Sequence, residues 1–474
     1  MAGRDDREDR HRPATHDRAG RRVAGSRDGV GRTLTPQVVS ARRRVVVVGA
    51  GSAGCAAALR ISDSGCDDVL VLEAGGQAPA VDIGVLPLSD PSRVRVHRDR
   101  EGTDLPRGRG TGGSSAVNGG YFLRAHAEDL DGWDQSVWAP DVVERAYTAL
   151  DGGGPGGGAM SVRRVGDAEM HPRATAFERA MRGAGHLTVE GVWPSPGIVR
   201  VRMNVVGGRR RTAADGLLAQ ALSRPHVDLR TRSVVDRIEI DSATVRSVVL
   251  DDGTVLPADV VVLCAGTIGS ATIAARSGLS ATMPLAEHRE LLVRSRTAST
   301  DPGPIGPVLQ TVVHTHDGFE IRCYAHDFAD HVAGVPRSGP AVGVAAMRAV
   351  GAGSIAVPED RGPDIDLGRP DAPALARMRE LADEVAAMLE GPEFTGLVAP
   401  GSTTVDETLG TSHHAWGALP MGGAADWEGR VRDVDGLWVA DAAALPTPLS
   451  SGPHATVTMA ASVIGERIAA SGLL

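Results

Sequence analysis

The chain has 474 residues, of which 23% are charged and 3% are aromatic, and its formal net charge at pH 7 is -9. This length suffices for two joined domains with full cores, and the acidic balance gives no reason to expect nucleic-acid binding. No run of about 18 apolar residues occurs, so no transmembrane segment is predicted.

Residues 1–40 are predicted to form a disordered tail, because they are rich in Arg and Asp and too poor in apolar residues to bury a core. An overlong start-site assignment is the alternative interpretation of this segment. The start lacks the apolar core of an export signal, and the four cysteines form no Cys-x-x-Cys motif. We therefore expect a cytoplasmic protein, with at most peripheral contact at the inner membrane face.

A β-α-β unit is predicted directly after the tail. Four consecutive valines at 45–48 predict a strand that is buried on both faces. Residues 52–64 then predict a helix, and residues 67–73 predict the next strand.

The turn between this first strand and the helix has the glycine spacing of a dinucleotide-binding site. Gly49 allows the tight turn, Gly51 lets the backbone approach a pyrophosphate, and Gly54 lets the helix pack closely on the strand. Glu73 ends the second strand, where an acid accepts hydrogen bonds from a ribose and disfavours a 2′-phosphate. Because these features occur in order, they favour a dinucleotide site over a glycine-rich turn in an unrelated α/β domain. The turn residues predicted to contact the cofactor are Gly49, Gly51, Ser52, Ala53 and Gly54.

Later parts of the chain add strands and a helix. Residues 245–250 and 259–263 predict a strand pair joined across Asp252-Gly253, a strong hairpin signal. Residues 370–390 have the apolar spacing of a helix.

Two further segments favour FAD over NAD as the dinucleotide. Residues 260–266 form an apolar strand that ends in a small turn, as flavoproteins use to close over the adenine half. Residues 436–442 form another strand, and its terminal Asp441 is suited to hold a ribityl hydroxyl or the pyrophosphate region.

Two glycine-containing segments resemble signatures of the glucose–methanol–choline (GMC) oxidoreductases. Residues 108–118, Gly-Arg-Gly-Thr-Gly-Gly-Ser-Ser-Ala-Val-Asn, look like the first signature, with Thr111 where an aliphatic residue is usual. Residues 266–280 look like the second signature, but Ala271 replaces the usual proline and Ser280 the usual glycine.

The C-terminal block from 414 to 468 also resembles the catalytic block of this family in order and spacing. Residues 417–422, Gly-Ala-Leu-Pro-Met-Gly, depart from the commoner Gly-Thr-Cys-x-Met-Gly. The resemblance covers about residues 43–470 and implies an α/β fold, in which a Rossmann-like FAD-binding domain is interleaved with an α+β substrate domain. The implied FAD-binding segments are 41–125, 200–280 and 411–474, and the implied substrate-binding segments are 126–199 and 281–410.

The resemblance also implies the catalytic residues. Alcohol oxidation removes a hydride, which the flavin takes, and a hydroxyl proton, which a histidine manages well near neutral pH. By its position in the family pattern, His414 is the general base, and His454 hydrogen-bonds the substrate oxygen. His413 is the alternative base, and a metal site at this pair is not expected because adjacent side chains in an extended segment point to opposite faces.

Further cofactor contacts follow from the same resemblance. The helix that begins at His454 is expected to point its N-terminus at the flavin, where the helix dipole stabilises negative charge. No histidine or cysteine occurs in residues 108–118, so we expect FAD to be held non-covalently. The residues implied to contact FAD, beyond the turn residues and Glu73, are Gly113, Ser114, Asn118, Val234, Asp441, Ala442, Ala455 and Thr456.

A narrower resemblance concerns the substrate. Residues 116–124, Ala-Val-Asn-Gly-Gly-Tyr-Phe-Leu-Arg, look like the GMC member of the mycofactocin system. That likeness implies that the protein reoxidises reduced mycofactocin (mycofactocinol) and passes electrons to a respiratory acceptor. The alternative is a GMC dehydrogenase or oxidase of a small or aliphatic alcohol. A flavin protein without catalysis is disfavoured by the intact His414 and His454, and an NAD-dependent dehydrogenase by the flavoprotein segments.

Overall fold

The computed structural model describes residues 42–154, 156–298, 305–359 and 361–472. The predicted tail, residues 1–40, lies outside the described residues. All described residues belong to one compact unit.

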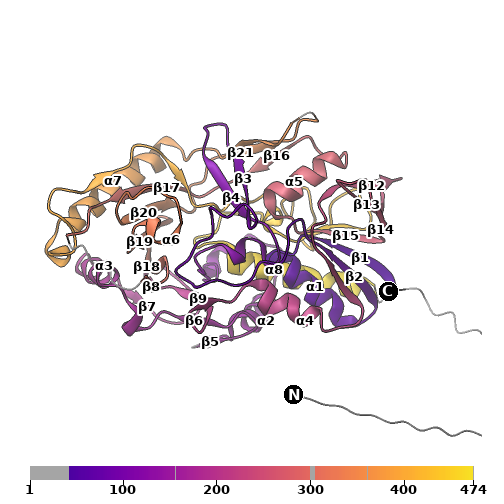
Figure 1. Ribbon diagram of the computed structural model, residues 1–474, viewed down its shortest axis with the longest axis horizontal. Helices are drawn as coiled ribbons and strands as arrows, with labels where there is room; N and C mark the ends of the chain where they lie inside the picture. The colour runs from indigo at the N-terminus through magenta and orange to yellow at the C-terminus, as the bar shows by residue number, and fades with distance from the viewer. Residues whose placement is uncertain (1–41, 155, 299–304, 360, 473–474) are drawn as a thin grey trace, which may run out of the picture. The chain divides into compact units, whose positions relative to one another are not determined.

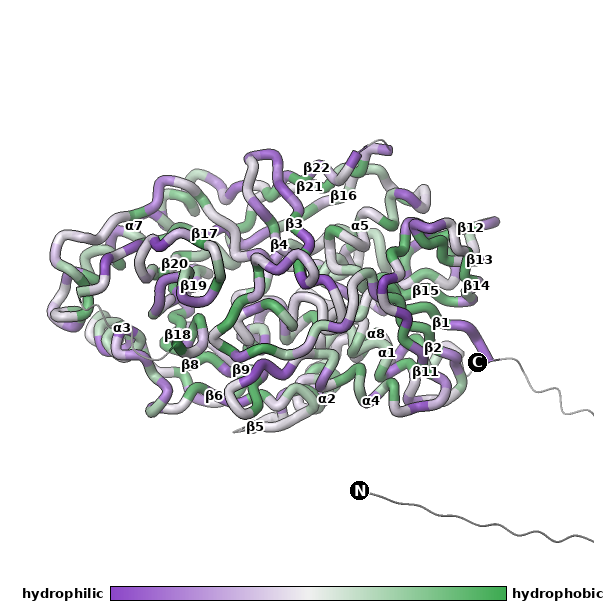
Figure 2. Tube along the Cα trace, viewed as in Figure 1, coloured by the Kyte–Doolittle hydropathy of each residue, from purple (hydrophilic) through white to green (hydrophobic). Residues whose placement is uncertain are grey.

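A parallel sheet of five strands contains the predicted β-α-β unit (Figure 1). The first strand pairs in parallel with its two neighbours, and Val45 lies opposite Val69 on one side and Val260 on the other. The four valines at 45–48 are buried. Figure 2 shows their strand, β1, beside β15 (residues 260–263), and both strands are apolar. The strands are, in order, β11 (Val227–Arg230), β2 (Asp67–Leu72), β1 (Arg43–Val48), β15 (Val260–Leu263) and β25 (Leu437–Val439).

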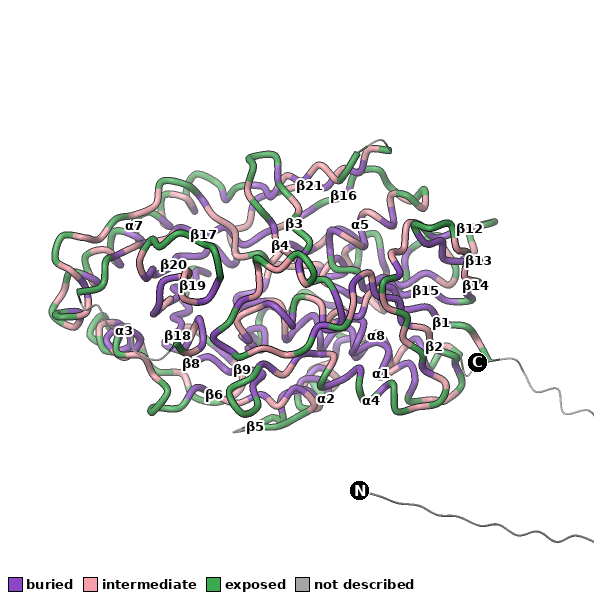
Figure 3. Tube along the Cα trace, in the orientation of Figure 1, coloured by how far each residue is buried: buried purple, intermediate pink, exposed green. Residues whose placement is uncertain are grey.

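Helix α1 (Ser52–Ile61) packs against the C-terminal helix α8 (His454–Ser471). The two helices approach so closely that a Cβ atom on Gly465 would lie 2.9 Å from the carbonyl oxygen of Ala57. Helix α8 is buried along most of its length, as Figure 3 shows. Helix α2 (Pro140–Asp151) packs on α8 as well.

The predicted pairing of residues 245–250 with 259–263 is wrong. Strand β13 (Thr244–Leu250) does turn back at the predicted hairpin, but its partner is β14 (Val255–Pro257). Strand β14 is short, and after Pro257 a single further bond, from the Ala258 N–H to the carbonyl oxygen of Arg246, joins the two segments. The chain then enters the parallel sheet as β15, and β13 pairs on its other side with β12 (Val235–Asp241).

A second, larger sheet is mostly antiparallel; it lies at the left of Figure 1, and the parallel sheet lies at the right. Side chains alternate between its faces, so Phe319, Ile321 and Cys323 join an apolar cluster with helices α3 (Pro172–Gly183) and α7 (Ala372–Leu389). The opposite face of the same strand carries Glu320, Arg322 and Tyr324. The strands run in the order β23 (Thr404–Val405), β17 (Arg289–Arg294), β20 (Ala341–Ala346), β19 (Phe319–Tyr324), β18 (Leu309–His314), β8 (Gly197–Arg200) and β7 (Thr188–Val189), with β24 (Gly410–Thr411) also on β17.

The remaining elements are short. Of the helices that the structure describes, none combines the length and the apolar character needed to cross a bilayer. The smaller elements are β3 (Val94–Arg98), β4 (Asp104–Gly108), β5 (Gly156–Gly157), β6 (Val162–Arg164), β9 (Arg202–Val206), β10 (Arg209–Arg210), β16 (Thr282–Leu285), β21 (Gly353–Ala356), β22 (Asp364–Asp366), α4 (Ala219–Ala221), α5 (Gly266–Arg276) and α6 (Phe328–His331).

Candidate active site

The turn between β1 and α1 admits only glycine at two positions. Gly49 has a φ of 105°, and its N–H donates to the carbonyl oxygen of Leu72 at 2.7 Å. A Cβ atom on Gly49 would lie 2.4 Å from the carbonyl oxygen of Cys264, and one on Gly54 would lie 1.8 Å from that of Gly49. The turn is therefore as tight as the glycine pattern predicts.

The same turn forms a cradle with the first GMC-like segment. A Cβ atom on Gly113 would lie 2.7 Å from the Cα atom of Gly51, so the two backbones touch. Among the described residues no side chain caps α1, whose first residues are Ser52 and Ala53. Their N–H groups are available for an anionic ligand, as a pyrophosphate site requires.

The Glu73 carboxylate is buried and bound by backbone. Its Oε2 accepts the N–H of Ala50 at 2.9 Å, and its Oε1 accepts those of Gly75 and Gly110 at 2.8 Å each. Glu73 therefore ties the end of β2 to the fingerprint turn and to the segment that contains Gly113.

Ser114 and Asn118 both anchor that segment locally. Ser114 Oγ accepts the N–H of Gly108 at 3.2 Å, and Asn118 Oδ1 accepts that of Gly120 at 3.0 Å. The Asn118 amide nitrogen lies 3.3 Å from Nδ1 of His454. Asn118 is thus a direct neighbour of a predicted catalytic residue.

The remaining predicted cofactor residues are Val234, the neighbours Asp441 and Ala442, and the neighbours Ala455 and Thr456. The carbonyl of Val234 accepts the Asp251 N–H at 2.9 Å, and the carbonyl of Ala442 accepts the Gly417 N–H at 3.0 Å. Ala455 and Thr456 are buried in the first turn of α8, which has neither an acidic residue nor a side-chain cap.

The carboxylate of Asp441 is buried at the end of β25. Its Oδ1 accepts the N–H of Ala443 at 2.8 Å, and its Oδ2 accepts the hydroxyl of Ser270 at 2.5 Å. Burial raises the pKa of Asp441 to about 6. Its position connects the second GMC-like segment with the C-terminal block.

His454 presents one ring nitrogen that no described residue contacts. Its Nδ1 lies 3.3 Å from the Asn118 amide and 3.4 Å from the carbonyl oxygen of Tyr121, and its ring meets Phe122 edge-on at 5.0 Å. The Tyr121 carbonyl can only accept, which favours a proton on Nδ1, whereas the Asn118 amide nitrogen only donates, which favours a proton on Nε2. We assign the proton to Nε2, because the Asn118 contact is the shorter one and the Gly120 N–H on Asn118 Oδ1 holds the amide nitrogen toward His454. Nε2 is buried without a partner among the described residues. Burial lowers the pKa of His454 to about 4, so the ring is neutral at pH 7.

His414 is held by two consecutive residues of another segment. Its backbone N–H donates to Glu287 Oε1 at 2.7 Å, and its Nδ1 lies 3.0 Å from Nδ1 of His288. Burial, together with His288, holds the pKa of His414 well below its usual range. His413, by contrast, is exposed and has a left-handed φ of 61°.

Gly452 brings the two predicted catalytic histidines into one site. It lies two residues before His454, and a Cβ atom on it would be 3.5 Å from Cε1 of His414 and 3.0 Å from the ring of Tyr121. The two histidines are therefore close in space although far apart in sequence. A side chain at this position would press on the ring of Tyr121.

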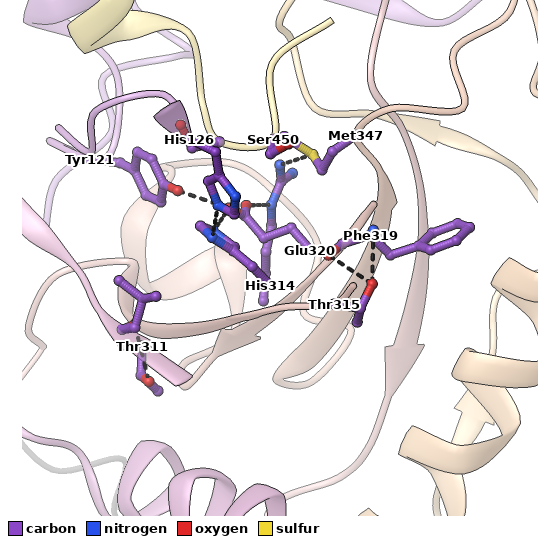
Figure 4. A network of polar contacts seen from close by, with 12 residues as sticks. Tyr121, His126, Thr311, His314, Thr315, Phe319, Glu320, Met347 and Ser450 are labelled. Carbon is purple, nitrogen blue, oxygen red and sulfur yellow. Dashed lines mark hydrogen bonds and ion pairs between the residues drawn. The ribbon is translucent and has the colours of Figure 1, made fainter. Parts of the chain in front are cut away.

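A polar network adjoins this site (Figure 4). It lies on the face of the large sheet that carries Glu320 and Arg322, opposite the apolar cluster. Glu320 accepts the hydroxyl of Tyr121 at 2.8 Å and lies 2.7 Å from Nε2 of His314. Arg322 donates to Glu320 at 2.5 Å, to Glu290 at 3.2 Å and to the hydroxyl of Ser412 at 2.6 Å. These buried charges compensate one another, as burial requires.

Sequence analysis assigned no chemistry to Glu287, His288 or Glu320. One signal was present, because residues 319–323 alternate apolar and charged side chains although they form a central strand. That pattern predicts a strand with one charged face. It contains nothing that identifies which helix terminus or loop the charged face meets.

The fold and these residues define a dinucleotide-binding α/β oxidoreductase. Family models of the GMC oxidoreductases match residues 43–311 and 356–461. The chain therefore belongs to the GMC oxidoreductase family, and it is an FAD-dependent enzyme that acts on CH–OH donors. The predicted family and fold class are confirmed.

Individual relatives agree with the family assignment. A GMC-type oxidoreductase encoded in the thcA 5′ region of Rhodococcus erythropolis is 33% identical, over 88% of this chain and 96% of that one. An oxygen-dependent choline dehydrogenase of Rhizobium johnstonii is 32% identical over 44% of this chain and 40% of its own. Among solved structures, pyridoxine 4-oxidase from Mesorbium loti shares the fold, with a TM-score of 0.78, 23% identity and coverage of 90% of this chain and 99% of that one.

The described residues fit FAD. The touching backbones at Gly51 and Gly113 and the uncapped start of α1 suit a pyrophosphate, and the uncapped start of α8 suits the anionic end of a flavin. The unpartnered Nε2 of His454 lies at that same helix end.

Proposed function

We propose that His414 takes the hydroxyl proton of an alcohol substrate while Nε2 of His454 donates a hydrogen bond to the same oxygen. FAD, when bound, accepts the hydride. The observation that carries this proposal is the meeting of two neutral histidines at Gly452, one of which has a buried ring nitrogen that no described residue contacts. Such a nitrogen is costly unless a ligand satisfies it.

The environment of His414 suits a general base. Its low pKa keeps the ring unprotonated at neutral pH, so a lone pair is available. For that lone pair to lie on Nε2, the ring proton must sit on Nδ1 and be donated to Nδ1 of His288. His454 then holds the developing alkoxide by its Nε2–H.

For the cofactor we propose non-covalent binding by the predicted residues, since residues 108–118 contain no histidine or cysteine. Gly51, Ser52 and Ala53 would meet the pyrophosphate, and Ala455 and Thr456 the flavin. The N–H groups at both helix starts supply the partial positive charge that this contact needs.

For the substrate we propose reduced mycofactocin, with electrons passed on to a respiratory acceptor. The support is the similarity of residues 116–124 to the mycofactocin-system member of the family. The alternative is a small or aliphatic alcohol, which the similarity to an oxygen-dependent choline dehydrogenase favours.

The two substrates are separated by anaerobic visible absorbance of the FAD-loaded protein, with reduced mycofactocin, ethanol and 1-butanol added separately. We expect reduced mycofactocin to bleach the flavin and the simple alcohols not to do so. Bleaching by a simple alcohol but not by reduced mycofactocin would contradict this substrate assignment and leave a general GMC alcohol dehydrogenase or oxidase.

A further inference from the structure

Arg210 is a buried guanidinium without an acidic partner among the described residues. It is 1% exposed. Its Nη1 donates to the carbonyl oxygen of Ala116 at 3.2 Å, and its Nη2 donates to that of Val85 at 3.0 Å. Its Nε is buried and has no hydrogen-bond partner in the described part of the chain. Carbonyl oxygens carry only partial negative charge, so the unit charge of Arg210 is not compensated.

Arg210 keeps its positive charge in this environment. Burial, together with the neighbouring Arg93, lowers the pKa of Arg210 to about 10. The guanidinium is therefore protonated at neutral pH. A buried cation lowers the stability of the fold unless an anion is close to it. A role for this charge is therefore expected where an anion binds or forms.

The charge lies beside both segments that are proposed to meet the flavin. Ala116, which accepts from Arg210, lies between Ser114 and Asn118 in the segment that resembles the first GMC signature. The amide nitrogen of Asn118 lies 3.3 Å from His454, the first residue of α8. Burial lowers the pKa of His454, and the charge of Arg210 lowers it further. The field of Arg210 therefore reaches the helix end that suits the anionic part of a flavin.

The proposed reaction brings negative charge to this place. The O–H and C–H bonds of the alcohol break, His414 takes the proton, and the hydride passes with both electrons to FAD. His414 thereby gains one positive charge, and the cofactor gains one negative charge. Because Arg210 is buried, solvent screens its interaction with that new charge only weakly.

We propose that Arg210 is the fixed positive charge that stabilises the negative charge which hydride transfer brings onto bound FAD. The inference rests on the proposed function, because it takes residues 108–118 and the start of α8 as the flavin contacts. Arg210 acts through space and exchanges no proton with the reacting pair, His414 and His454. A fixed positive charge favours the reduced cofactor over the oxidised one, so it raises the reduction potential of FAD.

A purely structural role for Arg210 makes a different prediction. Its two carbonyl contacts also tie residues 108–118 to the loop that contains Val85. Loss of these contacts would weaken the binding of FAD in both oxidation states, whereas loss of the charge would weaken the binding of the reduced state selectively. The ratio of the two affinities sets the reduction potential of bound FAD relative to free FAD, so the potential separates the two roles.

The test is the midpoint potential of bound FAD, measured by spectroelectrochemistry without an alcohol. Arg210→Met keeps the length of the side chain and removes its charge. We expect its affinity for reduced FAD to fall about tenfold more than its affinity for oxidised FAD, as for unit charges roughly 12 Å apart in a protein interior. This tenfold change corresponds to a potential lowered by about 30 mV for a two-electron couple.

Two further variants separate charge from packing. Arg210→Lys retains the charge but not the planar group that donates to two carbonyls, so its potential should stay close to that of the native protein. Measurement at about pH 6 keeps the lysine of this variant protonated. Arg210→Gln removes the charge but keeps an amide donor, so its potential should fall as in Arg210→Met, and it replaces that variant if Arg210→Met does not bind FAD.

Arg173→Met is the matched control. Arg173 is also buried, and it donates to the hydroxyl of Ser295 at 2.7 Å and to the carbonyl oxygen of Leu397 at 3.2 Å. Its guanidinium lies over the ring of Phe394, in the apolar cluster of the large sheet. The control variant should unfold at a lower temperature and keep the native potential of FAD.

The outcomes distinguish this inference from the proposed function. A native potential in the uncharged Arg210 variants would overturn the inference, as would an equal decrease in Arg210→Lys or in Arg173→Met. If no alcohol bleaches the flavin, the proposed function fails. The potential is set at an electrode and needs no alcohol, so it still decides whether Arg210 stabilises the reduced cofactor.

Discussion

His288 is the side chain that contacts Nδ1 of His414, and we propose that it determines which nitrogen of His414 carries the proton. The bond between the two Nδ1 atoms is 3.0 Å long, and a general base at Nε2 requires that His414 be the donor in it. The backbone bond to Glu287 holds the position of His414, whereas the proposed role of His288 is to accept the Nδ1 proton. His288 is therefore a positioning residue.

Replacement of His288 by phenylalanine should lower kcat/KM while FAD content stays native. A buried polar group left unpaired costs about 1–3 kcal/mol, which corresponds to a loss of about five- to 150-fold. His288→Asn retains an oxygen that accepts the Nδ1 proton, so it should recover much of the rate. Equal rates for the two variants, measured in steady state, would show that the ring volume matters and the hydrogen bond does not.

The pH profile of kcat/KM should reflect the low pKa values of both histidines. A pKa lowered from 6.5 by burial means that the neutral, active form persists as the pH falls through 6.5. We expect kcat/KM to remain level through that pH and to decline only toward pH 4, where His454 becomes protonated. A midpoint near 6.5 would contradict the assignment of buried, neutral histidines.

At the scale of elements, the strand-turn-helix unit at residues 43–61 was predictable because its constraints are local. Four valines, a glycine turn and a small-residue helix each signal their structure within a few positions. The partner of β13 was not predictable, because its hairpin signal fixes the turn and not the length of the returning strand. The returning strand covers only Val255–Pro257, and the chain then enters the parallel sheet at Val260.

Gly54→Ala should cause loss of FAD and a large loss of stability. The added Cβ atom would lie 1.8 Å from the carbonyl oxygen of Gly49, so α1 must move away from β1. Gly183→Ala is the matched control, since a Cβ atom there meets nothing within 4 Å. Thermal unfolding of Gly54→Ala should show a free energy of unfolding lowered by at least the upper end of the usual cost of a point mutation, about 3 kcal/mol. Flavin absorbance should show that this variant has lost FAD. Both measurements should change little for the control. Native flavin content in Gly54→Ala would contradict the proposed role of this turn.

At the scale of the whole molecule, the site exists only because distant segments meet. His414, His454 and Asn118 were predicted as site residues from the family resemblance, and the fold brings them together around Gly452. His288 and Glu320 were not predicted, because their roles arise from contacts between the large sheet and the C-terminal block. The boundaries between an FAD-binding and a substrate-binding domain stay a prediction, although every strand of the parallel sheet falls in the segments predicted for FAD.

The central claim is that this GMC oxidoreductase oxidises an alcohol with His414 as the base. The most direct test is anaerobic flavin absorbance of the native protein and of His414→Ala, after addition of reduced mycofactocin or a simple alcohol. We predict that one of these alcohols bleaches the native flavin, and that His414→Ala retains FAD but bleaches at least about a hundredfold more slowly. Bleaching of His414→Ala at the native rate would contradict the account.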